Sequence, residues 1–146
     1  MERKARIILL EDNQTVRRSL TLILEHKGYE VLAYENPLVC PLHYVHECPC
    51  SAQECCADFI LTDIDMPNFS GIEFIARLIN TRCKIKNIGI MSGAWSSLNR
   101  KRAEDMGCKV FEKPFKTFAL TEWINDCMQC VDNNHKLSDW FQPKRA

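Results

Sequence analysis

Residues 59–67 have the sequence FILTDIDMP, and this stretch decides the fold class. Its first four residues lack the polar alternation of a half-exposed strand, which is typical of a strand covered on both faces of a sheet. The run continues directly into Asp63, and Asp65 follows two residues later. We therefore expect a buried central strand whose carboxyl end carries acidic side chains.

Four other short apolar runs have the same character and lie at residues 6–10, 30–34, 88–91 and 109–112. Between and after them, apolar residues recur at helical spacing over residues 15–27, 71–79, 98–106 and 117–131. This alternation predicts a single α/β domain with a doubly wound sheet of five parallel strands and helices on both faces. In such a sheet, ligands bind at the carboxyl ends of the strands.

The composition excludes several classes of protein. The 146 residues suffice for one domain, and 46% hydrophobic with 26% charged residues is ordinary for a folded globular protein. Nineteen basic residues balance nineteen acidic ones, so no overall charge favours nucleic acid or an anionic membrane. No apolar run is long enough for a membrane span or a signal peptide. We expect a cytoplasmic protein without a direct nucleic-acid or membrane partner.

Five polar residues follow the predicted strands at the edge where ligands bind. Glu11 and Asp12 follow the first strand, Asp63 the third, Ser92 the fourth and Lys113 the fifth. Carboxylates placed this closely repel one another, and Mg²⁺ prefers oxygen ligands of this kind. One Mg²⁺ ion and Lys113 would balance the three negative charges and, with Ser92, stabilise the oxygens of a phosphoryl group. The residues therefore favour phosphoryl transfer onto the Asp63 carboxylate.

A series of motifs, in this order and spacing, resembles response-regulator receiver domains: Glu11-Asp12, Leu61-Thr62-Asp63-Ile64-Asp65-Met66-Pro67 with Gly71, Met91-Ser92-Gly93, and Lys113-Pro114-Phe115. The resemblance covers about residues 5–131. It implies a flavodoxin-like (βα)₅ fold and a phosphoacceptor in a two-component phosphorelay. Such a domain takes a phosphoryl group from a histidine kinase or a phosphotransfer protein and signals through a partner protein. It is not an enzyme beyond its self-catalysed phosphorylation and dephosphorylation.

The resemblance also implies roles for individual residues. Asp63 would be the phosphoacceptor, assisted by Ser92 and Lys113. Four residues would supply the protein's ligands to Mg²⁺: Asp12 directly, Glu11 through water, Asp63, and Asp65 by its backbone carbonyl. The Lys113–Pro114 bond would be cis. The downstream partner, whose identity the sequence leaves open, would bind the face formed by residues 98–106, 109–112 and 117–131.

One position departs from the family pattern. Receivers usually carry Tyr or Phe three residues before the lysine, where this chain has Val110. Phe111 is adjacent, but neighbouring residues of a strand point to opposite faces, so its ring cannot replace the missing one. We therefore expect the signal to leave the phosphorylation site in a different way.

The chain has nine cysteines, five of them between positions 40 and 56, where the family has its second helix. This density favours a structural zinc site, with free buried thiols, a disulfide and an iron–sulfur centre as the alternatives. The predicted zinc ligands are Cys40, Cys48, Cys50 and Cys56, which would clamp both ends of the segment. Cys127 and Cys130 lie in the last predicted helix and are assigned to packing.

Other functions compete with the phosphorelay. A metal or redox sensor on a receiver fold, with the cysteine segment as its input, is compatible with all these residues. Asp63-Ile64-Asp65 also resembles the start of haloacid-dehalogenase-type phosphotransferases, which place this motif after their first strand instead. A flavodoxin-type electron carrier would need a phosphate-binding first loop, and the Glu11-Asp12 pair would repel that anion.

For the domain organisation, we expect a stand-alone receiver domain over residues 1–131, with residues 40–56 as its cysteine-rich segment. Residues 132–146 would form a C-terminal tail in which Trp140 and Phe141 serve as anchors.

Overall fold

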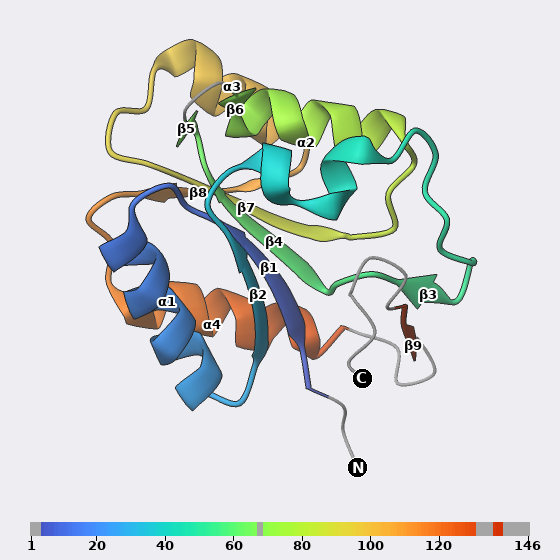
Figure 1. Ribbon diagram of the computed structural model, residues 1–146. Helices are drawn as coiled ribbons and strands as arrows, with labels where there is room; N and C mark the ends of the chain where they lie inside the picture. Colours follow the sequence, from blue (N-terminus) through green and yellow to red (C-terminus); the bar gives the residue numbers. More distant parts are fainter. Residues whose placement is uncertain (1–3, 67–68, 131–135, 139–146) are drawn as a thin grey trace.

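The structure is a computed structural model that describes residues 4–66, 69–130 and 136–138. Five strands form a central parallel sheet in the order β2-β1-β4-β7-β8 (Figure 1). Their bounds are β1 (Arg6–Leu10), β2 (Glu30–Tyr34), β4 (Phe59–Asp63), β7 (Asn87–Ser92) and β8 (Lys109–Glu112). The predicted flavodoxin-like α/β fold in a single domain is therefore confirmed.

Helices cover both faces of this sheet (Figure 1). On one face lie α1 (Gln14–His26) and α4 (Thr117–Met128), and on the other lie α2 (Gly71–Asn80) and α3 (Ser97–Asp105). The helix starts follow capping rules: Asn13, Ser70 and Ser96 each accept a hydrogen bond from a backbone N–H of the first turn.

The core has two layers, one on each side of the sheet. Every residue of β1 is buried, and successive side chains alternate between the layers. Ile8 and Leu10 pack with α2, whereas Ile7 and Leu9 pack with α1 and α4. A strand with apolar partners on both faces needs the continuous apolar run that the sequence shows.

The chain order of the strands positions the functional site. β1 lies between β2 and β4, and the crossovers on its two sides lead to opposite faces of the sheet. The ends of β1 and β4 thus flank the point where the winding reverses, which is where open parallel sheets bind ligands. The register pairs Leu10 with Thr62, so the residues that follow them, Glu11 and Asp63, are neighbours.

The segment between β2 and β4 contains no α-helix. It forms two 3₁₀ turns, η1 (Pro37–Val39) and η2 (Pro41–Tyr44), and the short strand β3 (Glu54–Cys55). A proline opens each 3₁₀ turn. Two more short strands, β5 (Asp65–Met66) and β6 (Phe69–Ser70), pair antiparallel after β4.

The predicted tail contributes to the fold. Strand β9 (Lys136–Leu137) pairs with β3, and the Arg6 guanidinium donates to the backbone oxygens of Cys56, at 3.1 Å, and Ser138, at 2.7 Å. Trp140 and Phe141, the predicted tail anchors, lie outside the described residues.

In the part of the chain that the structure describes, no helix is long and apolar enough to cross a membrane.

Candidate functional site

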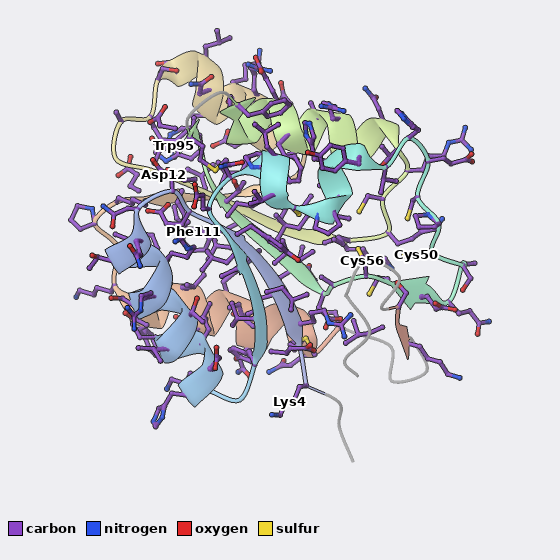
Figure 2. All side chains as sticks on the ribbon, in the orientation of Figure 1. Lys4, Asp12, Cys50, Cys56, Trp95 and Phe111 are labelled. Atoms are coloured by element: carbon purple, nitrogen blue, oxygen red, sulfur yellow. The ribbon has the colours of Figure 1, made fainter. Side chains whose placement is uncertain are left out.

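Three carboxylates meet at the carboxyl edge of the sheet. Glu11 and Asp12 follow β1, and Asp63 ends β4; each offers a carboxylate oxygen within 4.8 Å of the other two. Glu11 is 1% exposed and Asp63 is 8% exposed, whereas Asp12 faces solvent. The structure therefore brings together the acidic residues that the sequence selected, at the edge where Figure 2 shows Asp12.

Lys113, which follows β8, joins two of these carboxylates. Its Nζ atom lies 3.0 and 3.2 Å from the two Glu11 oxygens and 2.9 Å from Asp63 Oδ2. Burial lowers the pKa of Lys113, but the hydrogen bonds and the negative charges of Asp63 and Glu11 together outweigh burial and raise it above its ordinary value. Lys113 therefore stays cationic and holds the Asp63 side chain in one orientation.

One lysine does not neutralise this acidic group. Burial, followed by the hydrogen bond and the charge of nearby Asp63, raises the pKa of Glu11 to about 7, although Lys113 opposes the shift. Buried carboxylate oxygens with unbalanced negative charge are the ligands that a hard divalent cation requires. The side chains of Glu11, Asp12 and Asp63 therefore fit Mg²⁺.

Backbone contacts fix the acidic residues. The Arg17 guanidinium of α1 donates to the Glu11 backbone oxygen at 2.8 Å, and Glu11 N donates to the Tyr34 oxygen at 3.1 Å. The Thr62 hydroxyl donates to the Asp63 backbone oxygen at 2.9 Å. Our sequence reasoning missed Arg17. Its position one turn into a helix that follows an acidic pair is the signal that would have identified it.

Ser92 lies at the same edge, at the end of β7, and is 1% exposed. Its Oγ accepts a hydrogen bond from Ala94 N at 3.0 Å, and its backbone oxygen accepts one from Lys113 N at 2.8 Å. The Lys113–Pro114 peptide bond is cis, as expected. Ser92 and Lys113 are thus linked directly through the backbone at this edge.

Gly71 allows the backbone after Asp63 to pass close to the start of α2. A Cβ atom at this position would lie 2.0 Å from the Asp63 backbone oxygen and 3.0 Å from Thr62 Oγ1. Because the nearest atom belongs to a buried main chain, the clash cannot be relieved by a side-chain rotation. Gly71 N also donates to the Ile64 oxygen at 2.9 Å, which fixes the distance.

We expect Gly71→Ala to lower the free energy of unfolding by about 3 kcal/mol, at the upper end of the usual cost of overpacking. Gly93→Ala is the matched control, because its Cβ would meet nothing closer than 4.0 Å. Urea denaturation of the two variants and the parent measures both values. Equal stabilities of the two variants would contradict the role assigned to Gly71.

Asp65 is exposed in β5 and has no side-chain oxygen in the acidic group. The predicted use of its backbone carbonyl as a Mg²⁺ ligand stays a prediction. Val110 and Phe111 of β8 pack on opposite faces of the sheet, as expected: Val110 lies against the core layer of α2 and α3, and Phe111 against that of α4.

The predicted zinc ligands are not assembled as one group. Among the described residues, only Glu11, Asp12 and Asp63 form a set of three or more potential ligand atoms within 4.8 Å of one another. Cys40, Cys48, Cys50 and Cys56 do not, and all nine cysteines are free thiols. The Cys56 thiol instead donates to the sulfur of Cys83, which lowers the pKa of Cys83 to about 7. The sequence had given Cys83 no role.

Comparison with known proteins agrees with the geometry. Residues 7–125 match the model of the response regulator receiver domain. The chain is 34% identical over 121 residues to the response regulator receiver protein CpdR of Brucella abortus, over 83% of this chain and 92% of that protein. It is 33% identical over 86 residues to the CAI-1 autoinducer sensor kinase/phosphatase CqsS of Vibrio cholerae; this match covers 59% of the chain but only 11% of that protein. None of the relatives named here is described as a metal or redox sensor.

Solved structures agree on the fold. A CheY-like response regulator receiver domain protein from Methanospirillum hungatei superposes with a TM-score of 0.72 at 22% identity, over 87% of this chain and 95% of that one. The chemotaxis response regulator CheY4 of Vibrio cholerae superposes with a TM-score of 0.67 at 21% identity, over 86% and 99%. The family match, the fold and the acidic group with its lysine agree. The chain therefore belongs to the response regulator receiver domain family, the phosphoacceptor signalling domains of two-component systems.

Proposed function

We propose that Asp63 is the residue of this receiver that accepts the phosphoryl group, from a histidine kinase or a phosphotransfer protein. The observation that carries the proposal is the pair of contacts from Lys113 Nζ to the buried carboxylates of Asp63, at 2.9 Å, and Glu11, at 3.0 Å. A carboxylate held by a half-buried ammonium beside two further acids is positioned for an incoming phosphoryl group.

Mg²⁺ would be held by the carboxylates of Asp12 and Asp63, with Glu11 acting through water and Asp65 through its backbone carbonyl. When bound, the ion supplies positive charge to the oxygens of the transferred phosphoryl group. Asp12 is the exposed member of the acidic group and gives the ion access from solvent. Receiver domains bind Mg²⁺ at such an acidic group, and the three carboxylates within 4.8 Å support this assignment.

The chain's own residues divide the remaining work. An oxygen of Asp63 forms the new bond to phosphorus as the bond between phosphorus and the donor's leaving atom breaks. The Lys113 ammonium neutralises part of the charge that spreads over the phosphoryl oxygens, and the Ser92 hydroxyl donates a hydrogen bond to one of them. The same groups hold the acyl phosphate until water removes it.

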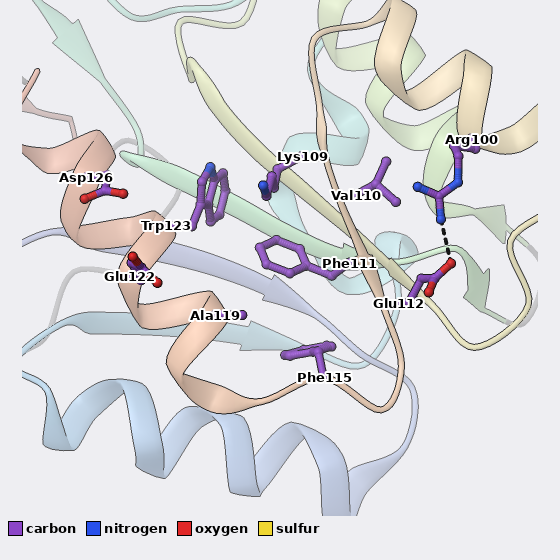
Figure 3. Close-up of a pocket in the computed structure, with 10 residues that line it drawn as sticks. All are labelled: Arg100, Lys109, Val110, Phe111, Glu112, Phe115, Ala119, Glu122, Trp123 and Asp126. Carbon is purple, nitrogen blue, oxygen red and sulfur yellow. Dashed lines mark hydrogen bonds and ion pairs between the residues drawn. The ribbon is translucent and has the colours of Figure 1, made fainter.

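The downstream partner would bind the face formed by α3, β8 and α4. An open pocket of about 640 Å³ lies there (Figure 3). Phe111, Phe115 and Trp123 give it an aromatic floor, and charged side chains of both signs surround that floor. A partner segment with an apolar anchor and flanking polar groups suits such a surface.

Trp95 connects the phosphorylation site to this face. It lies three residues after Ser92, and its indole N–H donates to the Phe111 backbone oxygen at 2.9 Å. The Arg100 guanidinium lies 5.7 Å from the ring centroid of Trp95 and pairs with Glu112 at 2.6 Å. With Val110 in place of an aromatic residue, we assign the transmission of the signal to Trp95 and its contacts.

Binding of beryllofluoride, which imitates the phosphoryl group, is therefore expected to change the tryptophan fluorescence of the protein. The change should be lost in Trp95→Phe and kept in Trp123→Phe, because Trp123 packs against Phe59 and Phe111 on the opposite face of the sheet. A change that persists in Trp95→Phe would refute this role.

Residues 1–131 would form the receiver domain. We infer a cytoplasmic location from the uneven spacing of the nine cysteines, five of which lie between positions 40 and 56, unlike the spread cysteines of secreted disulfide scaffolds.

The proposal is tested by mixing the full chain with Mg²⁺ and acetyl phosphate and recording intact masses. We expect a single phosphoryl adduct that forms with Mg²⁺ and is absent when a chelator is added first. An adduct that forms equally well without a divalent ion, or none at all from protein shown to bind Mg²⁺, would contradict it.

A further inference from the structure

Four cysteines from three chain segments converge at the amino edge of the sheet, at the opposite end from the acidic group. Cys56 precedes β4 and Cys83 precedes β7, and these neighbouring strands pair Phe59 with Asn87. Cys48 and Cys50 belong to the loop after η2. Figure 2 shows Cys50 and Cys56 close together at this end, far from Asp12.

The four thiols form two contacting pairs. The Cys56 thiol donates a hydrogen bond to the Cys83 sulfur, and the Cys48 thiol donates one to the Cys50 sulfur. Cys56 also interacts electrostatically with both members of the other pair. The Cys48 backbone N–H donates to the Thr81 oxygen at 2.8 Å, which anchors this loop beside the turn that carries Cys83.

Backbone amides point at two of these sulfurs. Cys48 accepts hydrogen bonds from the N–H groups of Cys50 and Lys84, and Cys83 accepts one from Ile85 N–H. Amide donors aimed at sulfur favour a thiolate, the form in which cysteine binds a metal, although burial outweighs them at Cys48 and raises its pKa. The Lys84 ammonium adds positive charge next to Cys83.

The surrounding segment has little regular structure of its own. Between β2 and β4, only two 3₁₀ turns and the two-residue strand β3 are present. Cys50 and Cys56 are nevertheless buried, at 8% and 1% exposure. A cross-link at this point would add to the β3–β9 pairing and to the Cys48–Thr81 backbone hydrogen bond that hold the segment.

We propose that Cys48, Cys50, Cys56 and Cys83 bind one zinc ion in a structural site that fastens segment 40–56 to the starts of β4 and β7. Zinc takes four thiolates in a tetrahedron with bonds of about 2.3 Å, so the sulfurs would be roughly 3.8 Å apart. No three thiols of the described residues have sulfurs within 4.8 Å of one another, so zinc binding requires the two pairs to move closer together.

Binding releases the four thiol protons to solvent and leaves a net charge of −2 on the site, which Lys84 partly offsets. Four protein ligands leave no open position, which makes the site structural rather than catalytic. The proposed zinc ligands differ from those predicted from the sequence at one position: they include Cys83 and leave out Cys40. Cys40 packs in the same core cluster, but among the described residues its sulfur accepts the local Leu42 N–H and interacts with Cys83 only electrostatically.

The test is native mass spectrometry of the full chain, purified under a phosphine reductant and titrated with zinc. We expect one zinc ion per chain, which a strong chelator removes. Cobalt(II) added in its place should give the visible absorption of a tetrahedral thiolate site. Reduced wild-type protein that binds neither ion would overturn the proposal, as would a Cys56–Cys83 disulfide under these conditions.

Variants identify the ligands. Cys83→Ser and Cys48→Ser should weaken zinc binding by at least about 100-fold, whereas Cys40→Ser should stay within about threefold of the parent. Because all three variants keep the acidic edge, phosphorylation with Mg²⁺ and acetyl phosphate reports that each is folded. Loss of zinc in Cys40→Ser but not in Cys83→Ser would refute the ligand set. The site is independent of the phosphoacceptor, so Asp63→Asn should bind zinc normally.

Discussion

Replacing Asp63 by Asn is expected to abolish formation of the phosphoryl adduct. An amide oxygen is too weak a nucleophile to attack phosphorus, and the substitution removes one negative ligand from the group that would hold Mg²⁺. The new side chain has the shape of the old one, so the fold should be kept. Intact-mass spectra recorded with Mg²⁺ and acetyl phosphate measure the result.

Asp65→Asn is the matched control, because it makes the same chemical change two residues further along the chain. The Asp65 side chain is exposed and lies outside the acidic group, and only its backbone carbonyl is assigned to the ion. We expect this variant to form the adduct. If Asp65→Asn also lost phosphorylation, a second catalytic carboxylate of the haloacid-dehalogenase kind would be favoured instead.

Replacing Lys113 by Met is expected to slow phosphorylation by about 100-fold, the usual cost of removing one preorganised charge from a transition state. Met keeps the apolar stem of the side chain but not the ammonium that contacts Asp63 at 2.9 Å and Glu11 at 3.0 Å. The rate of adduct formation at saturating Mg²⁺ is the measurement, so that a change in ion affinity does not obscure it.

Lys101→Met controls for the loss of one positive charge. Lys101 is exposed on α3, so its removal should leave the rate within about twofold, as is usual for surface changes away from a site. Equal rates for Lys113→Met and the parent would remove Lys113 from the phosphoryl-binding groups.

The fold could be predicted because each element carries its own local pattern. The run at residues 6–10 became β1 without change, and the capping residue Ser70 lies directly before the predicted helix that became α2. The acidic site was equally accessible to sequence reasoning. A parallel sheet gathers the ends of its strands at one edge, so Asp12, Asp63 and Lys113 had to meet once the strands were placed.

The remaining features depend on contacts between distant residues that no local pattern encodes. Arg6 reaches Ser138 across 132 positions, and β9, which lies in the predicted tail, pairs with the distant strand β3. Cys83 joins Cys56 only because β4 and β7 are neighbours in the sheet. The density of cysteines at 40–56 favoured Cys40 as a zinc ligand. The order of the strands instead places Cys83, which lies outside that segment, next to Cys56.

The central claim is that the phosphoryl group resides on Asp63. Reduction of the phosphorylated protein with borohydride converts an aspartyl phosphate to homoserine, which peptide mass spectrometry can locate. We predict homoserine at position 63 in protein treated with Mg²⁺ and acetyl phosphate, and none in protein treated without the phosphodonor. Homoserine at position 12 or 65, or a phosphate that survives on another residue type, would contradict the account.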